Sequence, residues 1–405
     1  MKKILFISNG HGEDAIANKI ISCLRAGPVP DVDIHGWPMV GEGGAYTKNE
    51  IPVMGPFNRL PSCGFATLSW RWMVKDLFAG WIPTHLRQIK AAAALKKSYS
   101  LIIAVGDIVV IGAACLSGSP FFLVGCAKSS YYAHMAGYTR LEKYLLRKHC
   151  RKTFPRDALT AEELDKWHVP NAYVGNPMMD DLEGTGRKFG IPESATVIGV
   201  LPGSRFDAEA NARHLLRVAE KLNPDRLSSP LFFLFAAYDN FNIEHTALKF
   251  APEQGMQEWK TEKPSKEDAD NGIALHLTYG HGTKAWFIKH RFADVLRKSA
   301  LIVGTAGMAN EQAVGLGKPL IVFPTEGVMG PAYVKMKMKY FGPSALRVPA
   351  DPISVAKAIE DLLADTAKQS RMSLAGQERM GAPGASQAIA DEIIRFLSAT
   401  DEQKS

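Results

Sequence analysis

The chain has 405 residues, which is more than one ordinary hydrophobic core holds, so we expect two domains. Its composition, 46% hydrophobic and 22% charged, excludes a mainly disordered or fibrous protein. No apolar run reaches the roughly 18 to 20 residues that span a membrane, and the stretch before Asn9 is too short for a signal peptide. We therefore expect a cytoplasmic protein.

The net charge of +7 lies entirely in the first half, where residues 1–180 hold 21 Lys and Arg against 14 Asp and Glu, while the remainder holds 27 against 27. Such an excess suits nucleic acid, an anionic membrane surface or a phosphorylated substrate, or it forms a solvated face without a partner. The five cysteines are scattered, with no CxxC pair and no histidine at zinc-ligand spacing. We expect reduced thiols and no bound metal.

Strands and helices alternate through the first half. A buried strand at 4–7 leads through a polar loop into a helix from about Asp14, and continuous apolar strands follow at 101–105 and 121–124. A capping box at 160–163 predicts the start of a short helix. Apolar strands of this kind are typical of a parallel sheet that helices cover on both faces.

The same alternation restarts in the second half. It comprises strands at 197–201, 231–236, 301–303 and 320–323 and helices from about Ala309, at 351–363 and at 386–397. The segment 257–271 is rich in charge and is expected to be an exposed loop. The fold class predicted is α/β, with two Rossmann-like, doubly wound parallel-sheet domains joined near 184–191.

Parallel sheets bind ligands at the carboxyl ends of their strands, so the loops that follow strands are the first candidates for a functional site. The loop after the first strand combines glycines, an imidazole and two carboxylates: Asn9, Gly10, His11, Gly12, Glu13 and Asp14. The two acids either serve chemistry or simply favour the helix dipole. The third glycine of a dinucleotide-binding fingerprint is missing.

Asp107 comes after five apolar residues and Gly106, and it precedes four more apolar residues. A carboxylate in such surroundings is either paired or faces a site where its basicity is used, so Asp107 is a candidate general base. The alternative is a carboxylate that only accepts backbone N–H bonds in a turn.

Two loops of the second half suit a phosphate group. Gly203, Ser204 and Arg205 offer close backbone approach, hydroxyl and amide donors, and a guanidinium. The second loop precedes a helix, whose free N–H groups favour an anion, and comprises Gly304, Thr305, Ala306, Gly307 and Met308. Neither loop is a P-loop.

Residues 58–98 combine aromatic and basic side chains. Three of the seven tryptophans fall within residues 70–81, and the segment as a whole carries seven basic groups and one acid. This pattern is typical of a membrane-surface anchor, and its candidate members are Trp70, Arg71, Trp72, Lys75 and Trp81. The alternative is a core helix with solvated lysines. Nucleic acid is not expected to be a partner, because no recognised binding module is present.

Together these segments resemble a known family. The loop 8–14, Gly106-Asp107, the segment 173–180, Leu201-Pro202-Gly203-Ser204-Arg205 and Gly304-Thr305-Ala306 look like signature segments of lipid-A-disaccharide synthases, in particular of the lipid-A-disaccharide synthase-related branch. The resemblance runs from about residue 3 to 397. It implies the glycosyltransferase-B fold, in which two Rossmann-like domains face each other across a cleft.

The resemblance implies residues 1–183 as the acceptor and membrane-facing domain, 184–382 as the nucleotide-sugar domain, and 383–405 as a helix that crosses back to the first domain. Asp107 would then be the general base, with Asp14 and His11 in the acceptor-side loop. The phosphate loops would hold the donor, and Glu311 or Gln312 the ribose.

The implied activity is inverting, metal-independent transfer from a UDP-sugar to a lipid acceptor at the cytoplasmic membrane face, with no cofactor besides the UDP-sugar co-substrate. Two alternatives stay open: a non-hydrolysing UDP-sugar 2-epimerase and a non-catalytic lipid-binding protein on the same fold. The first loop and residues 327–331 depart from the family pattern, which leaves the sugar and the acceptor unassigned.

Overall fold

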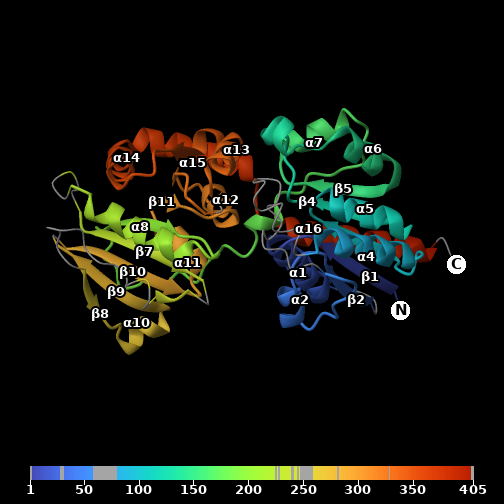
Figure 1. The fold of residues 1–405 in the computed structure, drawn as a ribbon, viewed down its shortest axis with the longest axis horizontal. Coiled ribbons are helices and arrows are strands. Elements are labelled where there is room, and N and C mark those ends of the chain that lie inside the picture. Colours follow the sequence, from blue (N-terminus) through green and yellow to red (C-terminus); the bar gives the residue numbers. More distant parts are fainter. Residues whose placement is uncertain are drawn as a thin grey trace. The chain divides into compact units, whose positions relative to one another are not determined.

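The computed structural model describes residues 2–27, 32–57, 80–223, 226, 229–238, 241–243, 246, 259–280, 282–327 and 329–402. The chain divides into two compact units (Figure 1). Unit 1 comprises Met1–Asp180 and Gly381–Ser405, and unit 2 comprises Asp181–Met380. The boundaries lie between Asp180 and Asp181 and between Met380 and Gly381, whereas the sequence predicted them after 183 and after 382.

Unit 1 is built on a five-stranded sheet whose strands all run parallel, in the order β2-β1-β3-β4-β5. The strands are β1 (Lys2–Ser8), β2 (Val32–Pro38), β3 (Leu101–Val105), β4 (Phe121–Gly125) and β5 (Cys150–Pro155). Every residue of β3 and β4 is buried, as expected for central strands covered on both faces.

Helices cover both faces of this sheet. They are α1 (His11–Ala26), α2 (Gly44–Lys48), α4 (Trp81–Ala94), α5 (Ile108–Ser117), α6 (Arg140–His149), α7 (Ala158–Asp165) and α16 (Ala385–Glu402), with 3-10 turns η2 (Ser130–Met135) and η3 (Pro177–Met179). Helices α4, α5 and α6 pack on the face that carries Leu5 and Ile102. On the other face α1 and α16 pack together, and Phe396 of α16 meets Phe122 of β4 edge to face at 5.3 Å.

The C-terminal helix α16, red in Figure 1, is therefore part of unit 1. The buried carboxylate of Asp180 holds its start, because it accepts hydrogen bonds from the backbone N–H groups of Gly384 and Ser386. The N–H of Asn176 donates to the carbonyl of Ala382 over 3.3 Å. The two places where the chain passes between the units are thus fastened to each other within unit 1.

Unit 2 is built on an eight-stranded sheet in the order β13-β12-β11-β6-β7-β10-β9-β8. Its strands are β6 (Thr196–Leu201), β7 (Leu231–Ala237), β8 (Lys260–Glu262), β9 (Ile273–Tyr279), β10 (Thr283–Lys289), β11 (Leu301–Gly304), β12 (Leu320–Val322) and β13 (Ala345–Arg347). The pairs β8·β9 and β9·β10 are antiparallel and the other pairs are parallel. The α/β class and the Rossmann-like character of both units are as predicted, with this antiparallel extension at one edge of the second sheet.

The helices of unit 2 are α8 (Ala208–Glu220), α10 (Lys266–Asp270), α11 (Phe292–Lys298), α12 (Met308–Gly315), α13 (Pro331–Phe341), α14 (Pro352–Ala364) and α15 (Thr366–Met380), with the 3-10 turn η5 (Gly342–Ser344). Helices α8 and α14 bury Leu215 and Ile359 against one face of the sheet, which presents Phe233 and Phe235. On the opposite face Val295 of α11 packs with Trp286.

Three local predictions differ from the structure. Helix α1 begins at His11 rather than near Asp14. Helix α7 begins at Ala158, capped by Asp157, and a capping box occurs instead at Thr139 and Glu142 of α6. The predicted loop 257–271 contains strand β8 and helix α10. At α6 and α7 side-chain hydrogen bonds to backbone N–H groups set where the helix begins, and the sequence pattern shows these bonds only indirectly.

Trp70, Arg71, Trp72 and Lys75 lie outside the described residues, so Trp81 is the one predicted membrane-facing side chain whose surroundings the structure gives. No helix in the described part of the chain is both long enough and apolar enough to cross a membrane.

Candidate active site

The sheet of unit 1 has its topological switch point between β1 and β3, because the chain leaves β1 toward β2 on one side and reaches β3 on the other. The loops that follow these two strands meet there. The side-chain amide of Asn9, after β1, donates to Oδ1 of Asp107, after β3, over 2.7 Å. The N–H of Val109 donates to the same oxygen over 3.0 Å, so Asp107 also caps helix α5.

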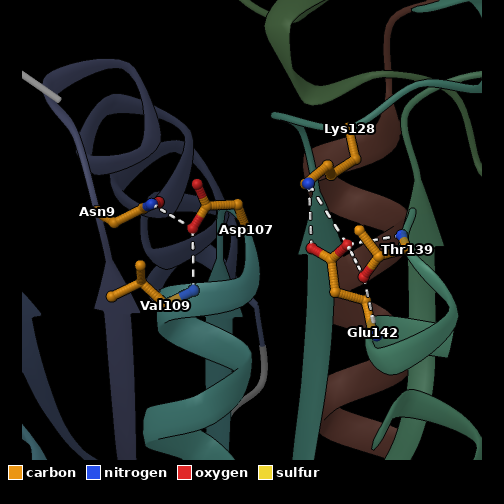
Figure 2. A network of polar contacts seen from close by, with 6 residues as sticks. All are labelled: Asn9, Asp107, Val109, Lys128, Thr139 and Glu142. Atoms are coloured by element: carbon orange, nitrogen blue, oxygen red, sulfur yellow. Dashed lines mark hydrogen bonds and ion pairs between the residues drawn. The ribbon is translucent and has the colours of Figure 1, made fainter. Parts of the chain in front are cut away.

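Both donors therefore bind one oxygen of the Asp107 carboxylate, as Figure 2 shows. The other oxygen, Oδ2, has no hydrogen-bond partner among the described residues, and Asp107 is only partly buried. The sequence left open whether Asp107 is a base or a turn acceptor. The geometry allows both roles. Oδ1 accepts the two hydrogen bonds that fix the side chain, and Oδ2 is available to accept a proton.

Gly106 allows this arrangement. Its φ of +142° is a conformation that side-chain-bearing residues rarely adopt, and a Cβ at this position would lie 1.9 Å from Oδ1 of Asn9. The Asn9 amide thus lies directly against the Gly106 backbone, which brings it within reach of Asp107.

An ion pair lies beside Asp107 (Figure 2). Lys128, in the loop after β4, contacts Oε1 of Glu142 over 3.1 Å. Burial raises the pKa of Asp107, the Val109 N–H and the Lys128 cation lower it, and the Glu142 carboxylate raises it. Asp107 is therefore a carboxylate whose basicity is increased by its surroundings.

A second carboxylate lies in the loop after β1. Asp14 is 1% exposed, and its Oδ1 accepts a hydrogen bond of 2.5 Å from the Ser8 hydroxyl, which lies 2.7 Å from the Tyr46 hydroxyl. Its Oδ2 is buried without a hydrogen-bond partner among the described residues. Burial raises the pKa of Asp14 to about 6, although Ser8 and the nearby His11 lower it.

Glu13 lies next to this pair, with its carboxylate folded over Gly10, where a Cβ would lie 2.4 Å from Oε2. Burial, with smaller contributions from the charges of Asp107 and Asp14, raises the pKa of Glu13 to about 7. The imidazole of His11 is exposed and lies over Gly41, whose φ is +86°. The predicted acceptor-side residues are thus brought together at one end of the sheet.

Arg156, which follows β5, contributes a buried cation to the same end of the sheet. Its Nη1 donates to the carbonyl of Cys126 over 2.7 Å, and its charge lowers the pKa of Glu13. Sequence reasoning missed Arg156, Lys128 and Tyr46. Arg156 directly follows β5, so the rule that selected Asp107 would have found it had it been applied to every strand, whereas Lys128 lies three residues after the end of β4.

The switch point of unit 2 lies between β6 and β11, and the two predicted phosphate loops follow these strands. Thr305 joins them: its N–H donates to the carbonyl of Leu201 over 2.9 Å, and its hydroxyl donates to the carbonyl of Pro202 over 3.1 Å. Gly203 has a φ of +98°, and a Cβ there would lie 3.5 Å from the carbonyl oxygen of Thr305. Ser204 is exposed and Arg205 is partly exposed.

Helix α12 starts where these loops meet. Gly307 is its N-cap and supplies no side-chain hydrogen bond to the first turn, where the backbone N–H groups have no partner within the helix. At Gly304 a Cβ would lie 2.0 Å from Oδ1 of Asn310, so the helix packs tightly against the end of β11. Ala306 is buried and Met308 is the first helical residue.

The two candidates for ribose binding differ in their surroundings. Glu311 is 2% exposed and pairs with Lys337 of α13, whose ammonium lies 5.5 Å from the centre of the Tyr333 ring. Gln312 is partly exposed. The carboxylate is therefore already engaged by a cation, and the choice between the two residues stays a prediction. No group of three or more His, Cys, Asp or Glu within the described ranges is arranged to hold a metal ion.

Comparison with known proteins gives no matching family model and no matching curated protein. Solved structures match along nearly the whole chain. S. aureus MnaA in a structure with UDP is 14% identical, with 98% of this chain and 97% of that chain covered and a TM-score of 0.58. UDP-GlcNAc 2-epimerase from Neisseria meningitidis bound to UDP-GlcNAc is 14% identical, with 97% and 100% covered and a TM-score of 0.55.

The glycotransferase of kitacinnamycin is 15% identical, with 98% of this chain and 99% of that chain covered and a TM-score of 0.54. Identities this low show a shared fold. They confirm the predicted glycosyltransferase-B type of fold with two Rossmann-like domains. None of these three is a lipid-A-disaccharide synthase, so the resemblance to that family stays a prediction.

The close packing of Asn9 against Gly106 predicts a large effect of adding a methyl group. Gly106→Ala should lower the free energy of unfolding by about 3 kcal/mol, because the Cβ strains the backbone and displaces Asn9. Gly112→Ala, in helix α5 with no atom within 4 Å of the added Cβ, should raise it by up to about 1 kcal/mol. Thermal and urea unfolding of both variants measure this, and equal effects of the two would contradict the packing described.

The raised pKa of Glu13 predicts a pH-dependent stability. Between the ordinary pKa of 4.5 and the folded-state value of about 7, the folded protein holds a proton that the unfolded chain has lost, so stability falls as the pH rises. Glu13→Gln should therefore gain stability over the wild type progressively across this window and by a constant amount above it. Thermal melts across the window test this, with Glu50→Gln at an exposed site as control. A constant difference between Glu13→Gln and wild type at every pH would refute it.

Proposed function

We propose that this protein is an enzyme that acts on a UDP-sugar and transfers the sugar, with inversion and without a metal, to a lipid acceptor at the cytoplasmic face of a membrane. Asp107 supports this proposal most directly, because one oxygen is fixed by two donors while the other is open at the switch point of unit 1. A base for an acceptor hydroxyl needs this combination of fixed position and open acceptor.

In the proposed reaction Oδ2 of Asp107 takes the proton of the acceptor hydroxyl. The acceptor oxygen then forms a bond to the anomeric carbon, and the bond from that carbon to the UDP oxygen breaks with inversion. UDP leaves as an anion, which the Arg205 guanidinium, the Ser204 hydroxyl and the N-terminus of α12 would stabilise. The resemblance to lipid-A-disaccharide synthases and the fold shared with proteins solved with UDP or UDP-GlcNAc both support a UDP-sugar donor.

The surface of helix α4 supports a lipid acceptor. The helix buries Thr84 and Gln88, and the Gln88 amide donates to the carbonyl of Met39 over 2.7 Å. Its exposed face carries large apolar side chains, namely Trp81 (38% exposed), Ile82 (52%), Leu86 (54%) and Ile89 (49%). Arg87 and Lys90 are exposed on the same helix. Apolar side chains flanked by cations favour an anionic lipid surface.

A second candidate function is non-hydrolysing 2-epimerisation of a UDP-sugar, which the shared fold with the Neisseria meningitidis UDP-GlcNAc 2-epimerase favours. It needs no lipid, so it leaves the exposed face of α4 without a role. A non-catalytic lipid-binding protein would bind membranes but no UDP.

Product analysis distinguishes the enzymatic candidates. Wild-type protein incubated with UDP-GlcNAc, UDP-glucose or UDP-galactose and a lipid extract should release UDP and form a glycolipid. Asp107→Asn should reduce this turnover by about a hundredfold to ten-thousandfold, because the base is lost. Liquid chromatography with mass spectrometry measures UDP, glycolipid and epimerised donor. Retained turnover in Asp107→Asn would exclude Asp107 as the base, and an epimerised donor without UDP release would establish the epimerase.

Vesicle binding tests the membrane face. The double variant Ile82→Ser/Leu86→Ser should bind vesicles of phosphatidylglycerol and phosphatidylethanolamine about tenfold or more weakly than the wild type, because two exposed apolar side chains are lost. The control Ile353→Ser/Leu374→Ser removes side chains in unit 2 that are 66% and 68% exposed, and it should bind as the wild type does. Co-sedimentation measures both. Equal binding by the two double variants would contradict a role for α4.

A further inference from the structure

The ion pair of Lys128 and Glu142 has no role in the proposed reaction as stated so far. Its components come from the loop after β4 and from the first turn of α6, and it lies at the same end of the sheet as Asp107. Its effect on Asp107 depends on two features: Glu142 holds Lys128 in place, and Lys128 makes no bond to Asp107 within the described part of the chain.

Glu142 is a rigid anchor. It is 1% exposed, and its Oε2 accepts hydrogen bonds from the N–H of Thr139 over 2.7 Å and from the Thr139 hydroxyl over 2.8 Å. Lys128 lies 3.1 Å from Oε1 and 3.4 Å from Oε2, and its side chain is 16% exposed. A lysine held by a buried carboxylate in a capping box keeps its charge in one place.

The lysine does not bind Asp107. Within the described part of the chain its hydrogen bonds and ion pairs go to Glu142, whereas Asp107 receives its hydrogen bonds from Asn9 and Val109. In Figure 2 no dashed line joins the two groups of residues. A lysine bonded to Asp107 would occupy Oδ2, the oxygen that a substrate hydroxyl has to reach.

Charged and titratable groups face Asp107 from several elements. They are Glu13 from α1, Cys126 and Lys128 from the loop after β4, and Glu142 from α6. The Lys128 cation lowers the pKa of Asp107, while Glu142 raises it and the negative charge of Asp107 in turn raises the pKa of Glu13 and Cys126. Lys128 therefore opposes both burial and the neighbouring carboxylates.

We propose that Lys128, anchored by Glu142, is a positioning residue that holds a positive charge beside Asp107 and so favours its carboxylate form, while leaving Oδ2 open to the acceptor hydroxyl. This role rests on the proposed function, in which Asp107 is the base. The proposed role has two requirements: a cation near enough to favour the carboxylate form of Asp107, and an Oδ2 that has no hydrogen-bond partner. A lysine bonded to Oδ2 would meet the first requirement and not the second.

The ionisation of Asp107 can be followed without any substrate. We suggest ¹³C NMR of the aspartate carboxyl carbons in the full-length protein, with the Asp107 resonance identified by its loss in Asp107→Asn. Lys128→Met should move the titration midpoint of Asp107 up, because the cation that favours its carboxylate form is removed. Glu142→Gln, whose side-chain oxygen still accepts from Thr139, should move it down. Lys128→Arg, which keeps the charge, should stay near the wild type.

Shifts in opposite directions for the two neutralising variants support the proposal, since a merely structural role would not reverse with the sign of the charge removed. If Lys128→Met fails to fold, Lys128→Gln, which also removes the cation, takes its place, and an upward shift supports the proposal. An unchanged midpoint in folded Lys128→Met or in Glu142→Gln overturns it.

Failure of the proposed function would be seen separately, because this titration needs neither donor nor turnover. Where turnover is found, the acidic limb of its pH profile should move with the NMR midpoint. Below that midpoint Lys128→Met should then lose about tenfold in rate for each pH unit of upward shift.

Discussion

The hydrogen bond from Asn9 to Asp107 is the interaction on which the site of unit 1 depends. It joins the loops after β1 and β3 at the topological switch point, where the strand order reverses. It forms only because Gly106 has no side chain. This bond and the Asp107 cap on α5 both use the same carboxylate oxygen, Oδ1. The fixed orientation leaves Oδ2 open, whereas the raised pKa of Asp107 comes from its burial, which the Asn9 hydrogen bond opposes.

The two units use the same plan with different chemistry. At the switch point of unit 1 three carboxylates lie close together. Ser8 donates a hydrogen bond to Asp14, and the charges of Arg156 and Lys128 lower the pKa values of Glu13 and Asp107. At the switch point of unit 2 Thr305 fastens two glycine-containing loops at the uncapped start of α12. A proton acceptor in one unit and a pair of anion-binding loops in the other would supply the two functions that the proposed sugar transfer requires.

The sequence was sufficient for the fold and for most of the unit 1 site, because apolar strands followed by polar loops show both the parallel sheet and the edge where ligands bind. Asp107 and the loop from Asn9 to Asp14 were found in this way. Lys128 was missed because a lysine after a strand resembles any surface lysine until the buried Glu142 beside it is seen. The partner of Glu311 was also out of reach, since Lys337 lies on another helix and only packing brings the two together.

The most direct test of the account is a calorimetric titration of the purified protein with UDP, UDP-glucose, UDP-galactose and UDP-N-acetylglucosamine in the presence of EDTA. The account predicts that UDP binds without a metal, that at least one UDP-sugar binds, and that Arg205→Ala weakens UDP about tenfold or more through loss of a charge-assisted bond. Absence of binding by every UDP species, or binding by Arg205→Ala equal to that of the wild type, would contradict it.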